Sequence, residues 1–218
     1  MTLIDLSHTV EHEMITYKGL PGPLVCDYWS HEESRAYYDE GTEFQIGRIE
    51  MVSNTGTYVD SPFHRFRDGR DLSELPLEPL AGREAVVVDG DGAIGPSTLE
   101  GLDLRGRAVL FRTGWDENWR TDAYYEGHPF LSFETADALV AAGAAIVGID
   151  SHNIDDTTGG SRPVHTTLLR AEIPIVEHLT GLGALPAGGA RFYAVPVKVK
   201  AFGTFPVRAF AELKEERE

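Results

Sequence analysis

The sequence predicts a mixed α/β domain in which a few helices cover a substantial sheet. Three observations support this fold class. Hydrophobic residues make up 42% of the 218 residues, enough for a buried core. Short apolar runs typical of strands dominate the first part of the chain, and strands alternate with helices in the second. No repeat or convincing linker interrupts the chain, so we expect residues 1–218 to form one domain.

The first half is predicted to consist mainly of strands. A first strand is expected at 2–10, and the Gly-Leu-Pro-Gly-Pro sequence that follows it indicates an ordered loop. The loosely alternating stretch 34–54 is expected to supply further strands. Apolar runs bounded by glycine and charge predict buried strands at 84–90 and 107–115. Between them, Ser97 is a candidate cap for a short helical turn.

The second half contains the clearest helix, within residues 131–144. Ser132 can cap its start, an Ala/Leu/Val face follows, and Gly143 can end it. The remaining predicted elements are a buried strand at 145–150, a helix at 164–171, a strand at 191–199 and a solvated tail at 211–218.

The charge balance and the single cysteine exclude several classes of function. With 19 basic and 35 acidic residues, the net charge is −16, which disfavours both nucleic-acid binding and attachment to anionic membranes. No signal peptide and no membrane span are expected, so we predict a cytoplasmic protein. Cys26 alone cannot form an intrachain disulfide or a CxxC site. Any metal must therefore be held by His, Asp and Glu.

Two groups of residues are candidates for chemistry. The first is the D-x-P-x-H string of Asp60, Pro62 and His64, where an extended backbone would point the carboxylate and the imidazole the same way. Such a pair suits a metal ligand beside a general base, but a turn-capping Asp and a surface His explain it equally well. The second is His165 with Glu177, which follows an apolar run. Taken alone, this pair favours a Glu exposed at a strand end.

A resemblance extends through nearly the whole chain. "IDLSHTV", "NTGTYVDSPFH", "VLFRTGW", "HPFLS", "VGIDSHNID", "VHTTLLRAEIPIVEHLTGL" and "GTFPVRAFA" occur in an order that resembles the metal-dependent cyclase family, which includes bacterial kynurenine formamidases (arylformamidases) and isatin hydrolases. The resemblance implies a swivelling β/β/α domain with a mixed or barrel-like sheet. It also implies a homodimer or higher homo-oligomer acting on a small-molecule substrate, with tryptophan catabolism as the suggested pathway.

The resemblance assigns roles to individual residues. The family motif is H-x-G-T-H-x-D-x-P-x-H, so Asp60 matches a metal ligand and His64 the catalytic His. His165 and Glu177 match the remaining metal ligands. Asn54 and Tyr58 stand where the family has its two metal-binding His residues.

These departures from the motif imply one divalent ion per chain, Zn²⁺ or Mn²⁺, held by the three surviving ligands. Asn54 and Tyr58 are then expected to bind substrate or to support the ligands. Turn formation by Asn54 and aromatic packing by Tyr58 are the competing explanations. His152 or Asn153 is expected to border the pocket.

Three hypotheses for the function follow. The first is a metal-dependent hydrolase of an amide or lactam C–N bond, with His64 as general base for a metal-activated water. The second is a one-metal cyclase, dehydratase or lactonase of the same fold, in which Tyr58 acts as an acid. The third is a metal-free protein that binds small molecules on an enzyme scaffold.

Overall fold

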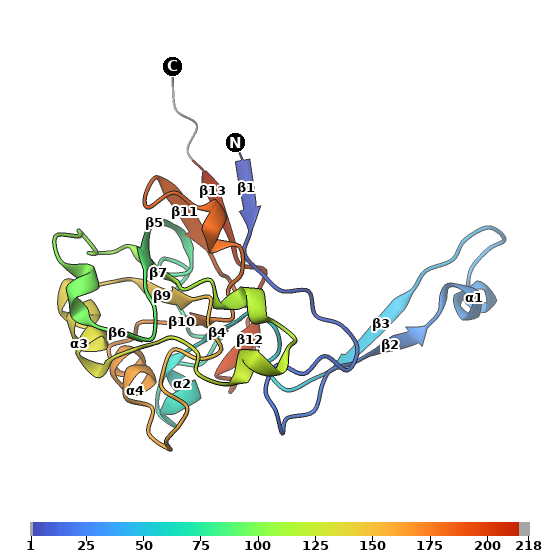
Figure 1. Ribbon diagram of the computed structural model, residues 1–218. Helices are drawn as coiled ribbons and strands as arrows, with labels where there is room; N and C mark the ends of the chain where they lie inside the picture. The colour runs from blue at the N-terminus through green and yellow to red at the C-terminus, as the bar shows by residue number, and fades with distance from the viewer. Residues whose placement is uncertain (1, 214–218) are drawn as a thin grey trace.

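A nine-stranded, mostly antiparallel sheet organises the computed structural model, which describes residues 2–213 (Figure 1). The strand order is β1-β13-β11-β5-β7-β9-β10-β4-β12. The strands of this sheet are β1 (Thr2–Asp5), β4 (Tyr58–Asp60), β5 (Ala81–Asp89), β7 (Ala108–Arg112), β9 (Ile146–Ile149), β10 (Ile175–Glu177), β11 (Ala190–Tyr193), β12 (Thr204–Pro206) and β13 (Phe210–Leu213).

The other elements are short. Two-stranded sheets form from β2 (Leu24–Trp29) with β3 (Ile46–Glu50) and from β6 (Ala93–Ile94) with β8 (Phe130–Leu131). The α-helices are α1 (His31–Ser34), α2 (Pro62–Arg65), α3 (Phe133–Ala142) and α4 (Pro163–Arg170). The 3₁₀ turns are η1 (Arg35–Tyr37), η2 (Pro96–Leu99), η3 (Trp115–Asn118), η4 (Asp122–Tyr125) and η5 (Leu182–Ala184).

The sheet is buried on both faces, as alternation along β5 illustrates. Val87 belongs to one apolar cluster, while Val86 and Val88 belong to a second cluster on the opposite face. Leu139 of α3 and Leu168 of α4 pack into that second cluster, so these helices cover one face. The parallel core β5-β7-β9-β10 thus has the continuous apolar runs expected of strands buried on both sides. The predicted mixed α/β fold with flanking helices is confirmed.

Both predicted helices form: the one expected at 164–171 is α4, and the one expected within 131–144 is α3, bounded by its predicted capping residues. Ser132 caps α3 by accepting the backbone N–H of Thr135, and Gly143 ends it in the left-handed conformation with φ of 75°. The turn near Ser97 differs from its prediction, because Gly95 is its cap and Pro96, with its fixed φ, occupies the first helical position. Among residues 2–213, no helix has the length and apolar character that crossing a membrane requires.

The C-terminal prediction was wrong in part. Residues 210–213 form β13, which pairs with β1 on one side and with β11 on the other. Phe210 and Ala211 supply apolar contacts between β13 and these two strands. Residues 214–218 of the expected tail lie outside the described residues. The strand predicted at 191–199 ends at Tyr193, and the first predicted strand ends at Asp5.

One hairpin projects away from the sheet (Figure 1). It comprises β2, α1 and β3, which we call the arm (residues 24–50). Nearly every residue of β2 and β3 is exposed. The arm carries large apolar side chains in water, including Tyr28, Phe44 and Ile49, which are 64%, 54% and 58% exposed.

Candidate active site

Three neighbouring strands bring the main polar residues onto one face. In the antiparallel β4–β10 pair, Tyr58 lies opposite Glu177, and in the β4–β12 pair Asp60 lies opposite Thr204. Tyr58 and Asp60 are two residues apart on a strand, so their side chains point to the same side. Strand register therefore places two carboxylates, a phenol and a hydroxyl at one site, all of them buried.

A short helix brings His64 to the same site. The chain turns at Ser61, and Pro62 begins α2 at the position where its missing N–H costs nothing. His64 Nδ1 lies 2.7 Å from Thr204 Oγ1 and 3.6 Å from Asp60 Oδ1. Asp60 and His64 therefore lie close together, as predicted. The backbone between them is a helical turn, however, and not the extended segment that was expected. Gly203 permits the close approach of the two backbones, since a Cβ at position 203 would lie 2.5 Å from the backbone nitrogen of His64.

His165 is held rigidly at the start of α4. Its Nδ1 lies 2.6 Å from Asp155 Oδ2, and the Asp155 carboxylate also accepts the backbone N–H groups of Val164 and His165. One carboxylate thus caps the helix and orients the ring. The other ring nitrogen, Nε2, lies 3.7 Å from Asp60 Oδ2 and 3.6 Å from Glu177 Oε1. A carboxylate behind an imidazole is the usual arrangement for a metal-binding His.

The electrostatics of this group favour a cation. Burial alone would lower the pKa of His165, but the carboxylates of Glu177, Asp155 and Asp60 together raise it to about 10. Burial raises the pKa of Asp60, yet the imidazoles of His64 and His165 outweigh it and hold that pKa below its usual value. Burial raises the pKa of Glu177.

The donor set fits a divalent ion. Asp60, His64 and His165 each offer a ligand atom, and these atoms lie within 4.8 Å of one another. Asp60 Oδ2 is buried and has no hydrogen-bond partner among residues 2–213, an arrangement that a bound cation would satisfy. Glu177 lies beside this group, and at 1% exposure it is not the solvent-exposed strand end that the sequence alone favoured.

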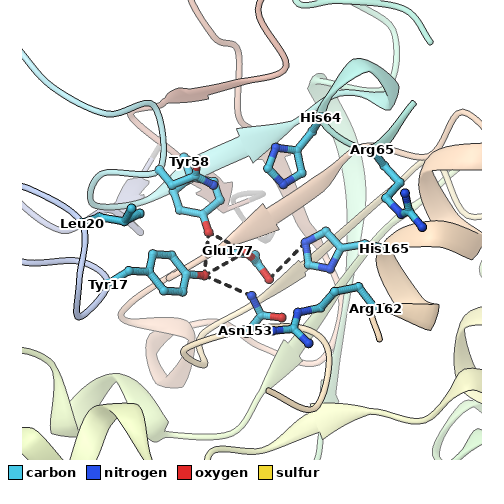
Figure 2. Close-up of a pocket in the computed structure, with 10 residues that line it drawn as sticks. Tyr17, Leu20, Tyr58, His64, Arg65, Asn153, Arg162, His165 and Glu177 are labelled. Atoms are coloured by element: carbon cyan, nitrogen blue, oxygen red, sulfur yellow. Dashed lines mark hydrogen bonds and ion pairs between the residues drawn. The ribbon is translucent and has the colours of Figure 1, made fainter. Parts of the chain in front are cut away.

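Tyr58 is fully buried and belongs to a hydrogen-bond network that reaches the partly buried Tyr17. Its hydroxyl donates to Glu177 Oε2 at 2.6 Å and lies 2.8 Å from the hydroxyl of Tyr17, which accepts from Asn153 Nδ2 at 3.1 Å (Figure 2). Burial, reinforced by the charge of Glu177, raises the pKa of both phenols well above 10. Both tyrosines therefore remain neutral and act as hydrogen-bond donors, a role that leaves them poor metal ligands.

Asn54 lines the same pocket as Tyr58, whereas the side chain of His152 does not. Asn54 is half-buried, and its Oδ1 accepts a hydrogen bond from Ser53. The ring of His152 packs behind the pocket, 4.7 Å from Tyr17 and 5.5 Å from Tyr124 between ring centroids. Its backbone carbonyl accepts from the Tyr17 hydroxyl. Asn153 is the residue of this loop that borders the pocket.

These residues enclose a pocket of about 270 Å³. It is lined by Tyr17, Leu20, Asn54, Tyr58, His64, Arg65, Asn153, Arg162, His165 and Glu177 (Figure 2). Sequence reasoning missed the orienting Asp155 and the shared Thr204, as well as both arginines. The one available signal was adjacency, since Arg65 follows His64 and Asp155 lies in the loop that also holds Asn153.

The chain is similar to a family model and to curated proteins over most of its length. A family model described as "Putative cyclase" matches residues 4–156. The kynurenine formamidase of Salinibacter ruber is 31% identical over 96% of both chains, and that of Bacillus cereus is 27% identical over 94% of this chain and 95% of its own.

Solved structures have the same fold. A potential metal-dependent hydrolase with cyclase activity is 26% identical, with a TM-score of 0.79 over 99% of both chains. Isatin hydrolase A from Labrenzia aggregata is 23% identical, with a TM-score of 0.82 over 98% of this chain and 94% of its own. The resemblance noted from the motifs is confirmed: the chain belongs to the cyclase family.

Proposed function

We propose that this chain is a metal-dependent hydrolase that cleaves the C–N bond of an aryl formamide of the N-formylkynurenine type. The class of enzyme predicted from the sequence agrees with its relatives, which include kynurenine formamidases, and with the His/Asp group in the pocket. One observation carries the proposal: Asp60 Oδ2 is buried, has no hydrogen-bond partner among the described residues, and lies 3.7 Å from His165 Nε2. Tryptophan catabolism is the corresponding pathway.

In this proposal Asp60, His165 and Glu177 would hold one ion per chain, Zn²⁺ or Mn²⁺, and His64, which also offers an atom to the group at Asp60 and His165, is assigned to proton transfer. A bound divalent ion supplies Lewis-acid polarisation of the amide carbonyl and a lowered pKa for water. Asp155 fixes the His165 ring so that Nε2, and not Nδ1, faces the site. Glu177 keeps Oε1 on the His165 side, while Ile154 N–H donates to that same oxygen at 2.7 Å.

His64 is the proposed general base, and hydrogen bonding determines which of its nitrogens acts. The single hydroxyl proton of Thr204 is donated to Asp60 Oδ1, so the Thr204 oxygen can only accept from His64 Nδ1. In the neutral form of the ring this bond places the proton on Nδ1, so that Nε2 is the nitrogen that can take a proton from water. The side chain is 34% exposed and lines the pocket, so solvent and substrate reach it. The same nitrogen would return the proton to the leaving amine.

Tyr58 takes the place of a metal-binding His as a neutral donor, and Tyr17 extends its hydrogen-bond network. The Tyr58 hydroxyl donates a hydrogen bond to Glu177 Oε2. Tyr17, Tyr58 and Asn54 all line the pocket. A phenol that keeps its proton also favours the second candidate function, a one-metal cyclase, dehydratase or lactonase in which Tyr58 acts as an acid. In either case Asn54 and His152 support the pocket, Asn54 at its wall and His152 behind it.

Turnover of N-formylkynurenine by metal-loaded protein tests the proposal. Protein stripped with chelator should be inactive, and Zn²⁺ or Mn²⁺ should restore formate release. If reloaded protein opens an aryl lactone and leaves N-formylkynurenine intact, the second function is correct. If it turns over neither but binds aromatic amides unchanged, the metal-free binding protein is correct.

The arm supports the predicted homo-oligomer. Its exposed apolar side chains form a surface of a kind that soluble proteins cover with a partner. The arm leaves and rejoins the body between Leu20 and Asn54, both pocket residues. We therefore propose that a second copy of the chain covers the arm in a homodimer, and that this contact positions one wall of the pocket.

Two further assignments belong to this proposal. Residues 1–218 act as one domain, and the compartment is the cytoplasm, where the exposed thiol of Cys26 would remain reduced.

A further inference from the structure

We propose that the pocket selects substrates carrying a carboxylate, and that Arg65 and Arg162 are the groups that bind it. This inference rests on the proposed function, because it concerns the same pocket. It narrows the substrate class to aryl formamides whose amine part bears a carboxylate. Hydrolysis would release formate and an aryl amine that retains the carboxylate.

Both arginines lie at the same side of the pocket. They line it on the side of His165 (Figure 2), and both also line the shallow groove that adjoins it. Arg65 belongs to α2, and Arg162 immediately precedes α4. Arg65 Nε donates to Thr166 Oγ1 of α4 at 3.0 Å, which fixes the position of Arg65 relative to the helix that carries His165.

Neither guanidinium forms a close ion pair with a carboxylate of the described residues, although the charge of Arg162 contributes to lowering the pKa of Asp156. Within residues 2–213, no carboxylate oxygen lies within 4.0 Å of either one. Seven other arginines have such a carboxylate, namely Arg35, Arg48, Arg70, Arg107, Arg112, Arg120 and Arg208. In a chain with 35 acidic and 19 basic side chains, two arginines without a close carboxylate at one pocket remain available to an anionic ligand.

Neutral groups orient the two guanidiniums and leave donors free. Arg162 Nη1 donates to the backbone carbonyls of Asp156, Gly159 and Ser161, at 3.2, 2.8 and 2.6 Å. Its Nη2 and Nε have no partner among the described residues, nor do the two Nη atoms of Arg65. A guanidinium held in this way keeps its charge and presents a planar fork that suits a carboxylate.

The arginines are also placed correctly relative to the reacting centre. Arg65 is adjacent in sequence to His64, and Arg162 precedes His165 by one helical turn. A substrate whose amide lies at His64 and His165 would therefore direct a carboxylate on its amine part toward α2 and the start of α4. A volume of about 270 Å³ suits a single-ring substrate of this kind.

The test compares two matched probes, 2-formamidobenzoate and its neutral methyl ester. Wild-type protein loaded with Zn²⁺ should favour the acid by about 10-fold or more in kcat/KM. Arg65→Gln and Arg162→Gln should each reduce kcat/KM for the acid about 10- to 100-fold, chiefly through KM, so that the acid-to-ester ratio falls toward one. A wild-type ratio near one, or a ratio unchanged in both variants, would overturn the proposal.

Arg67→Gln is the matched control, because Arg67 is exposed, lies two residues from Arg65 and does not line the pocket. It removes the same charge and should leave the acid-to-ester ratio as it is in wild type. Arg65→Lys and Arg162→Lys keep the positive charge but lack the planar guanidinium, so their acid-to-ester ratios should lie between those of the Gln variants and wild type. Circular dichroism melting confirms that each variant is folded.

A binding measurement separates failure of this inference from failure of the proposed function. Chelator-treated protein is titrated with 2-aminobenzoate in a calorimeter, so neither hydrolysis nor a metal contributes. Saturable binding that weakens about 10-fold or more in Arg162→Gln supports the inference, even if neither formamide is hydrolysed. Absence of saturable binding to wild type contradicts it, even if both formamides are hydrolysed.

Discussion

The hydroxyl of Tyr58 lies 2.6 Å from Oε2 of Glu177, directly across the β4–β10 pair. By the resemblance noted from the sequence, Tyr58 stands where a metal-binding His is expected, and in this chain its phenol proton occupies Glu177 Oε2. Both side chains are fully buried, which makes the bond a structural requirement as well as a feature of the site.

Removing this bond should destabilise the fold. Tyr58→Phe would leave a buried carboxylate oxygen with only the long contact to Tyr17 at 3.4 Å, so we expect a loss of about 1–3 kcal/mol in the free energy of unfolding, measured with urea. Tyr193→Phe is the matched control, because Tyr193 makes a 2.9 Å bond to Glu212 at a partly exposed position. Its loss should stay below about 0.5 kcal/mol. Equal losses for the two variants would contradict the account.

His64 should be needed for turnover and not for folding. His64→Gln keeps a polar side chain beside Thr204 but removes the base, so kcat on N-formylkynurenine should fall about 100-fold or more, with little change in unfolding free energy. His12→Gln, at an exposed His outside the pocket, serves as the control. Full activity in His64→Gln would reject the assigned role.

His8 should make stability depend on pH. Its ring stacks on Trp119 at 3.9 Å between centroids, and burial, partly offset by Asp116, lowers its pKa to about 4. The unfolded chain binds a proton near pH 6.5, so this contribution is present above that pH and is lost as pH falls from 6.5 to about 4.

In His8→Phe the stacking remains and the proton site is absent. The stability lost between pH 7 and 4 should therefore be smaller than in wild type by about 1–2 kcal/mol, after allowing for solvent at the half-buried ring. Urea unfolding of metal-free protein at several pH values measures this difference. An unchanged pH dependence would show that His8 does not contribute.

The arm should control assembly. Ile49→Asp places a charge at an apolar residue of β3 that is 58% exposed, so a monomer of this variant should fold normally but dimerise at least 10-fold more weakly. Sedimentation velocity across a concentration series measures the change, with Glu32→Gln on α1 as a control at an exposed charged residue. A wild-type protein that is monomeric at all concentrations would reject the homodimer.

The fold was predictable where local patterns decide the structure. Ser132 and Gly143 mark the ends of α3, and apolar runs such as that of β5 mark the buried strands. The arm was not predictable as a projecting element, because its apolar residues resemble core strands and nothing local indicates what covers them. β13 was missed because its charged continuation suggested a tail, whereas pairing with β1 and β11 decides its structure.

The site was predictable through its motif and only partly through its geometry. Asp60 and His64 are four residues apart, so the sequence brings them together whichever backbone forms. The burial of Glu177 depends on β10 lying between β9 and β4, which is a property of the sheet order. The roles of Asp155 and the two pocket arginines depend on where α4 packs, and no short sequence pattern contains that information.

The metal content of untagged protein, purified without chelator and measured by plasma mass spectrometry, tests the central claim most directly. We predict about one Zn or Mn per chain, a value that Asp60→Asn reduces at least 10-fold and that Tyr17→Phe, which leaves every proposed ligand in place, does not abolish. Wild-type protein that holds no metal, even after incubation with Zn²⁺ and Mn²⁺, would contradict the metal-dependent mechanism.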